Sequence, residues 1–139
     1  MLKLIHVSFL LGYAIIQACQ PFVEKYNFSQ EGKASYYANV LNGKPTASGE
    51  AYHPDSLTAA HRYLPLGTVI LVVNPRNQRQ IRLRVNDRGP YHRSRVLDVS
   101  RSAADSLGFL DDGVAHVHIK ALLSPQLADS LSQQLNKVR

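Results

Sequence analysis

Short stretches in which apolar and polar residues alternate dominate the middle of the chain and predict β-strands. The segment IRLRVND alternates Ile81, Leu83 and Val85 with polar residues, so one face of this strand is expected to meet the core and the other to meet water. Residues 67–73 read GTVILVV, an almost continuous apolar run rich in β-branched residues, which predicts a strand buried on both faces. Further strands are expected at residues 32–38, 95–100 and 114–122.

Two segments have the spacing of helices instead. Residues 100–108 read SRSAADSLG and predict a helix of one to two turns, with a serine as its N-cap and a glycine as its stop. Leu127, Leu131 and Leu135 are four residues apart and mark one face of an amphipathic helix. This helix is expected over residues 123–139. Many short strands around a small core favour a closed, mainly β barrel, because closure removes exposed strand edges.

The N-terminal segment has the pattern of an export signal. Lys3 precedes an apolar run that is too short to span a bilayer but fits the central region of a secretory signal peptide, which predicts a signal over residues 1–18. The run ends in IQAC, which resembles a bacterial lipobox, and Cys19 is the only cysteine of the chain. Lipidation of Cys19 is therefore expected, with a plain signal peptide as the alternative. Residues 19–31 are interpreted as a tether to the folded domain.

Composition and charge limit the classes of function. The chain has 139 residues, 45% of them hydrophobic and 19% charged, which suits one globular domain with a modest core. Its formal net charge is +6, and much of the positive charge falls between residues 76 and 101. A basic patch can bind nucleic acid. The export signal disfavours that partner, so lipid headgroups or acidic wall polymers are the expected anions. The alternative is that the arginines lie on the solvent-facing sides of the strands and pair with carboxylates.

Three polar segments near the strongest strands carry the candidate chemistry, with Glu50, His61 and Asp87 as their most attractive side chains. Each of the three alone has an ordinary structural explanation, as a solvated loop residue, a hydrogen-bonded histidine or a turn residue. His116 and His118 are two residues apart on an expected strand and so share a face. Without a third ligand nearby they are interpreted as surface or core histidines. No metal and no other cofactor is predicted.

Taken together, the motifs resemble a known family. The segments GKASYYA, PTASGEAY, LTAAHRYLPLGTVILVVN, VNDRGPYHRSRVLDVSRSAADSLG and GVAHVHIKAL resemble, in order, the motifs of the RlpA-like (rare lipoprotein A) double-psi β-barrel family. The resemblance covers residues 32–122 and implies a six-stranded closed barrel, as in barwin and expansin domains. It also implies a lytic transglycosylase that cleaves the β-1,4 bond between N-acetylmuramic acid and N-acetylglucosamine in peptidoglycan, leaves 1,6-anhydromuramoyl ends and favours peptide-poor strands.

The resemblance assigns roles to individual residues. Asp87 matches the barrel aspartate expected to act as acid and base, Glu50 is expected to polarise the sugar or share the proton, and His61 to orient a carboxylate. The residues expected to bind substrate are Tyr37, Tyr52, His53, Asp55 and Arg88. For Arg88 the alternative is that it only fixes the turn. The family commonly has an aspartate where this chain has His53, with Asp55 two residues later, which leaves a second interpretation open.

That second interpretation is a non-catalytic module that binds peptidoglycan or loosens the wall as expansins do. In both cases the expected partners are peptidoglycan strands and, through lipidated Cys19, a membrane, with unidentified cell-wall or division proteins as further candidates. Gln20 after Cys19, rather than an aspartate, favours the outer membrane, with the domain facing the periplasm. About 17 residues follow the barrel, so a glycan-binding SPOR domain is not expected.

Overall fold

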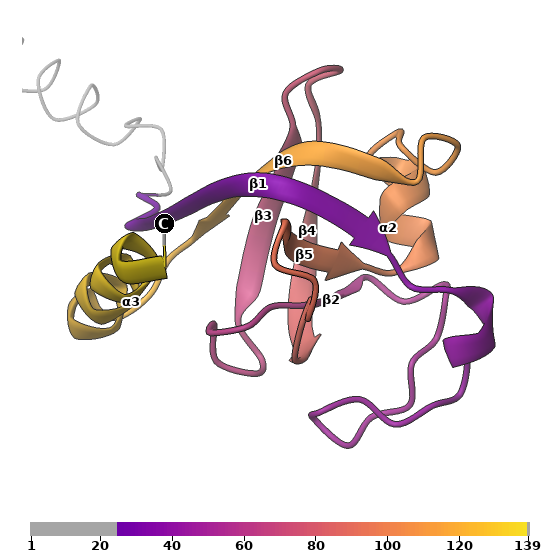
Figure 1. Cartoon of the computed structure of the whole chain (residues 1–139), viewed down its shortest axis with the longest axis horizontal. Helices are drawn as coiled ribbons and strands as arrows, with labels where there is room; N and C mark the ends of the chain where they lie inside the picture. The colour runs from indigo at the N-terminus through magenta and orange to yellow at the C-terminus, as the bar shows by residue number, and fades with distance from the viewer. Residues whose placement is uncertain (1–24, 139) are drawn as a thin grey trace, which may run out of the picture.

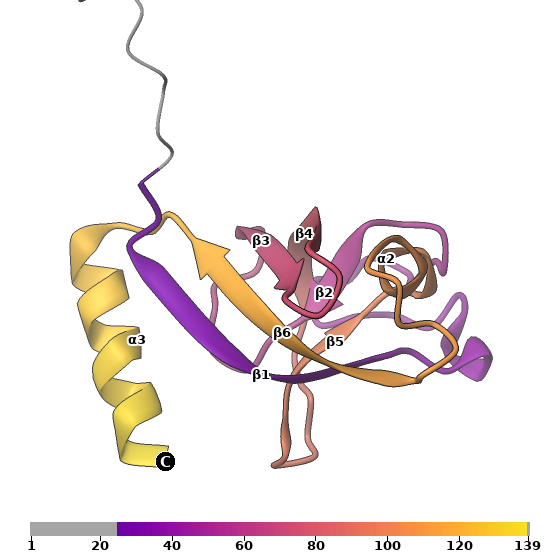
Figure 2. The ribbon, with the colours of Figure 1, turned by 90° about the horizontal axis from the view of Figure 1, so that it is seen from above.

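The computed structural model describes residues 25–138 of the chain (Figures 1 and 2). The expected signal peptide, Cys19 and most of the expected tether lie outside the described residues. In chain order the elements are β1 (Phe28–Tyr36), the 3-10 helix η1 (Asn39–Leu41), β2 (Thr58–Ala60), β3 (Val69–Asn74), β4 (Arg79–Asp87), β5 (Arg95–Val99), α2 (Arg101–Ser106), β6 (Val114–Ala121) and α3 (Pro125–Val138). None of the helices in this part of the chain has both the length and the apolar character needed to cross a membrane.

The six strands close into a barrel in the order β1-β5-β2-β4-β3-β6, which confirms the architecture predicted from the sequence. The pairs β1/β5 and β2/β4 are parallel, and the other pairs are antiparallel. The short strand β2 thus lies between the ends of β4 and β5, which are far from it in sequence. This arrangement places Asp87 of β4 and Asp98 of β5 on either side of Ala60 of β2.

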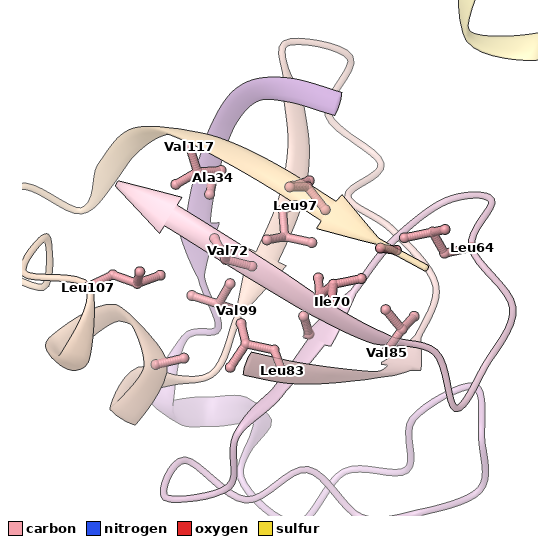
Figure 3. Close-up of a cluster of buried hydrophobic side chains, with 14 of the residues drawn as sticks. Ala34, Leu64, Ile70, Val72, Leu83, Val85, Leu97, Val99, Leu107 and Val117 are labelled. Atoms are coloured by element: carbon pink, nitrogen blue, oxygen red, sulfur yellow. The ribbon is translucent and has the colours of Figure 1, made fainter. Parts of the chain in front are cut away.

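Alternate residues of the strands fill the barrel (Figure 3). On β3, Ile70 and Val72 are fully buried, whereas Val69 is 56% exposed. The prediction that this strand is buried on both faces is therefore wrong. A small barrel has one interior, so even a continuous apolar run presents every second side chain to the outside. On β4 the predicted alternation is confirmed, with Leu83 and Val85 in the core.

The two predicted helices are present and pack as expected. The side chain of Ser100 caps α2 by accepting a hydrogen bond from the Ala103 N–H at 3.3 Å. On α3, Leu131 is 5% exposed, and Leu127 and Leu135 pack against the core cluster. The first strand begins at Phe28, four residues before the expected strand and inside the segment interpreted as a tether, because the Phe28 ring is buried.

Candidate active site

Asp87 lies at the end of β4 with both carboxylate oxygens held by hydrogen bonds. Oδ2 accepts a hydrogen bond from the Tyr37 hydroxyl at 2.7 Å. Oδ1 accepts hydrogen bonds from the backbone N–H groups of Ala47 and Arg88, each at 2.8 Å. The donors come from three separate segments, and two of them are backbone groups of fixed direction. The carboxylate of a half-buried residue is thereby held in one orientation at the barrel end.

Tyr37 follows β1 and is the side-chain donor to Asp87. Burial, and then the hydrogen bond to Asp87, raises the pKa of the Tyr37 phenol above its ordinary value, so the hydroxyl keeps its proton and donates it. The Tyr37 ring packs on Tyr52 with 4.5 Å between ring centroids. Tyr52 is only 3% exposed, and its hydroxyl accepts a hydrogen bond from the Arg101 N–H. The expectation that Tyr52 binds substrate is therefore wrong, since the residue is buried and packs against the Tyr37 ring instead.

The loop that carries TASGEAY is folded back on itself and docked onto β4. An isolated bridge joins Pro45 to Ala51, and the Thr46 N–H donates to the Glu50 carbonyl at 2.8 Å. Gly49 turns the chain with a φ of +89°, a value that glycine adopts without strain. The Ser48 N–H then donates to the carbonyl of Asn86 at 3.0 Å. This docking brings the backbone N–H of the loop to the Asp87 carboxylate.

Glu50 points from this loop to Arg84 on the outer face of β4. The two guanidinium Nη atoms donate to the two carboxylate oxygens at 2.5 and 2.7 Å, a two-pronged pair between half-exposed groups. Arg84 holds the pKa of the Glu50 carboxyl below its ordinary value. Of the two roles expected for Glu50, sharing a proton does not fit, because the arginine keeps it ionised. The outward direction of Arg84 was readable from the strand alternation, whereas its partner was not.

The His61 ring does not lie beside a carboxylate, where the sequence analysis expected it. Its ring is 1% exposed, and Nδ1 accepts hydrogen bonds from the backbone N–H groups of Tyr63 and Leu64 at 3.1 and 3.0 Å. Nε2 therefore carries the hydrogen and donates it to Gln30 Oε1 at 2.8 Å. Burial, and then the charges of nearby arginines, lowers the pKa of His61 to about 4.

The expectation that the His61 ring orients a carboxylate is therefore wrong, because both ring nitrogens are bonded elsewhere. Only the backbone of His61 reaches the site, through its N–H to the Asp87 carbonyl at 3.2 Å. Arg88 takes the structural role that the sequence left open. Its Nη1 donates to the carbonyls of His61 and Leu64 at 3.1 and 2.7 Å and fixes the turn between them.

His53 and Asp55 lie in the exposed loop that follows Tyr52. Burial raises the pKa of Tyr52, and the charge of Asp55 adds a smaller contribution in the same direction. The negative charge of Asp55 therefore acts on Tyr52, the residue on which the Tyr37 ring packs. Both side chains are exposed and stay candidates for contact with a substrate.

Asp98 on β5 is a site residue that the sequence analysis missed. Ala60 of β2 pairs with Asp87 on one side and with Asp98 on the other, so the two aspartates flank the same residue. Asp98 accepts a hydrogen bond from the Ser35 hydroxyl at 2.7 Å and pairs with Arg95 at 3.4 Å. The pattern RVLDVS sets this polar side chain between two core residues, which is the signal that could have found it.

The statement that His116 and His118 lack a third ligand is also wrong. Glu31 of β1 pairs directly with His118 of β6, and the three side chains offer ligand atoms within 4.8 Å of one another. Because Glu31 is far from the histidines in sequence, only the strand register could bring it to them.

Tyr37 and Asp87 are predicted to stabilise the fold together. Tyr37→Phe should lower the free energy of unfolding by about 1–2 kcal/mol, because a hydrogen bond to a carboxylate is lost. The same substitution should cost much less in an Asp87→Ala background, and urea denaturation of the four proteins measures the coupling. Tyr36→Phe is the matched control, since that hydroxyl donates to the Leu110 carbonyl at 3.1 Å and should not couple to Asp87. Equal losses in both backgrounds would contradict the Tyr37–Asp87 contact.

Solved structures share this barrel. The Streptomyces papain inhibitor matches with a TM-score of 0.58 and 26% identity, over 70% of this chain and 97% of that chain. The apo expansin of Clavibacter michiganensis matches with a TM-score of 0.56 and 21% identity, over 70% of this chain and 52% of that chain. The closed six-stranded order and these matches thus define a double-psi β-barrel protein.

Sequence relatives identify the family within this class. Residues 29–119 match the family described as lytic transglycolase, and the chain belongs to it, as the RlpA-like resemblance indicated. The endolytic peptidoglycan transglycosylase RlpA of Neisseria meningitidis is 44% identical over 101 residues, 73% of this chain and 42% of the relative. The probable RlpA of Treponema pallidum is 53% identical over 89 residues, 64% of this chain and 28% of the relative. The chain thus spans less than half the length of these curated relatives.

Proposed function

We propose that this chain is a lytic transglycosylase that acts on peptidoglycan. The observation that carries the proposal is the Asp87 carboxylate, held by three donors at the barrel end in a chain of the lytic transglycolase family. The Neisseria meningitidis relative is named an endolytic peptidoglycan transglycosylase and the Treponema pallidum relative a probable one, which supports the same reaction and substrate here. Peptide-poor glycan strands are the preferred substrate in this proposal, since no bulky stem peptide then has to pass the loops around the site.

In the proposed reaction one carboxyl group acts twice. Protonated Asp87 gives its proton to the oxygen between the two sugars as the bond from that oxygen to the muramoyl C1 breaks. The 6-hydroxyl oxygen of the same muramoyl residue forms a new bond to C1, and its proton passes to the Asp87 carboxylate. The carboxyl is regenerated, no water is consumed, and the products are an N-acetylglucosamine end and a 1,6-anhydromuramoyl end. A two-carboxylate hydrolase would instead add water.

Surrounding groups would position Asp87 and the substrate. Tyr37 and the Ala47 N–H hold the two carboxylate oxygens in place, so little reorientation is needed between the two proton transfers. Glu50 is ionised and neutralised by Arg84, and this ion pair ties the loop that carries the Ala47 N–H to the outer face of β4. His53 and Asp55 offer exposed hydrogen-bonding groups along the next loop.

The test is the chemical nature of the released fragments. The full chain, purified in mild detergent, is incubated with intact peptidoglycan sacculi and with amidase-treated, peptide-free strands. The masses of the soluble products are then determined by mass spectrometry. Release of fragments that are one water lighter than hydrolysis products supports a transglycosylase, and faster release from the peptide-free strands supports the substrate preference. Binding without release from either substrate would favour the non-catalytic wall-binding module and exclude the enzyme.

The same proposal includes a lipid anchor at Cys19, with the domain on the outer membrane and facing the periplasm. It is supported by the lipobox-like IQAC and by Gln20 after the single cysteine. Cells given an alkyne analogue of palmitate should label the chain, and Cys19→Ser should lose the label and move to the soluble fraction. A Cys19→Ser protein that remains in the membrane fraction would refute anchoring through this residue.

A further inference from the structure

Three metal-ligating side chains meet on the outer face of the long antiparallel pair β1/β6. His116 and His118 point outward from β6 on either side of Val117, which is fully buried in the core. Glu31 points outward from β1, directly opposite His118 in the strand register. The three side chains are 54%, 42% and 59% exposed for His116, His118 and Glu31. Their common face is therefore fixed by the backbone, while the side chains themselves can adjust.

The distances are close to those of a metal site. Glu31 Oε2 lies 3.1 Å from His118 Nε2 and 3.8 Å from His116 Nε2. Metal–ligand bonds of about 2.0–2.1 Å in a tetrahedral site separate the ligand atoms by about 3.3 Å. All ligand atoms of the group lie within 4.8 Å of one another, so small side-chain rotations suffice to bring them into range. We propose that Glu31, His116 and His118 bind one divalent transition-metal ion, for which zinc is the natural probe.

The donor set selects the class of metal. Two imidazole nitrogens and one carboxylate oxygen suit zinc and its neighbours, whereas magnesium and calcium prefer oxygen ligands throughout. Two histidines at positions i and i+2 of a strand lie on one face, and the carboxylate from the neighbouring strand supplies the third ligand. At least one coordination position remains open to solvent, which can be filled by water.

The charges beside the group affect its affinity for a metal ion, and the strand pairing decides which strands a bound ion would connect. Lys33 pairs with His116 and Lys120 pairs with Ser29, so two exposed cations flank the group and weaken its attraction for a dication. Glu31 is the one carboxylate in the group and is therefore expected to be essential for affinity. The bound ion would also join β1 to β6, the strand pair that brings the two chain ends of the barrel together, and would stabilise the folded state.

Calorimetric titration of the full chain, in mild detergent, with zinc, magnesium or calcium tests the site. Zinc should bind with a stoichiometry of one and raise the unfolding temperature by about 5 °C or more at saturation, whereas magnesium and calcium should do neither. Glu31→Gln, His116→Ala and His118→Ala should each weaken zinc binding by at least about tenfold, since even the loss of an outer hydrogen-bond partner costs about 10–100-fold. His92→Gln, which removes an exposed histidine outside the group, should leave zinc binding unchanged.

Two outcomes would overturn the proposal. Zinc binding that is retained in Glu31→Gln would mean that the carboxylate is not a ligand and that the histidines only bind metal adventitiously. Absence of saturable zinc binding to the unaltered chain would mean that repulsion by the flanking lysines outweighs the attraction of the three ligands for the ion. All variants change exposed side chains, and circular dichroism confirms that each is folded before its affinity is compared. Because the readout is metal binding, it is independent of whether the chain cleaves peptidoglycan.

Discussion

Asp87→Asn is expected to abolish the release of anhydromuramoyl fragments from peptidoglycan. The loss should be at least about 100-fold in rate, since general acid and base catalysis by a positioned group contributes about 10²–10⁴-fold. Asparagine keeps the size of the side chain and one oxygen that can accept the Ala47 and Arg88 N–H groups. The amide cannot take part in either proton transfer. The measurement is the initial rate of product release, quantified by mass spectrometry on peptide-free strands.

The control for this experiment is Asp112→Asn, the same change at an exposed aspartate that pairs with Arg76 at another part of the surface. It should release fragments at the unaltered rate. Retention of full activity by Asp87→Asn would refute the assignment of Asp87. If the unaltered chain releases nothing but binds strands, His53→Asp introduces the aspartate that the RlpA-like resemblance leads us to expect at that position. Activity that appears only in His53→Asp would show that His53 itself has converted the chain into a binding module.

The second large effect is an acid destabilisation caused by His61. Its pKa is about 4 in the folded chain and has the ordinary value of 6.5 when the chain is unfolded, so the unfolded state binds the proton more tightly. The stability due to neutral His61 is fully present above pH 6.5 and is lost as the pH falls towards 4. The difference between the two values corresponds to about 3 kcal/mol. Urea denaturation at pH steps from 7.5 to 4 measures it.

His61→Gln separates this effect from the titration of carboxylates. The variant should be less stable than the unaltered chain at pH 7 by about 2 kcal/mol, because backbone N–H groups of Tyr63 and Leu64 lose their acceptor. Its stability should fall less steeply between pH 6.5 and 4, since the titrating ring is gone. Parallel curves for the two proteins would contradict a buried neutral histidine. If the His61→Gln protein is folded but inactive, the His61 ring has a role in the reaction, contrary to what its buried position indicates.

Local rules were enough to predict five of the six strands, the helices α2 and α3 and one site residue, whereas the three-residue strand β2 was not predicted. The alternation along β4, the N-cap Ser100 of α2 and the leucine spacing of α3 depend on neighbours within a few residues, and all three are present in the structure. The boundary of β1 was wrong because Phe28 is ordered by burial in the barrel, which no local pattern reports. Motif order indicated Asp87, whose place at the end of a strand also follows from the local pattern.

By itself, then, the sequence determined the barrel class, the family and the candidate acid/base residue. Only the tertiary structure decided the partners of the polar side chains. Docking of the TASGEAY loop pairs Glu50 with Arg84, and barrel closure buries the His61 ring against Gln30 and sets Glu31 opposite His118. Each of these contacts joins residues about 30 or more positions apart, and they depend on strand register and side-chain direction. A one-residue change in register would turn every side chain of a strand to the other face, so spacing along the chain cannot specify them.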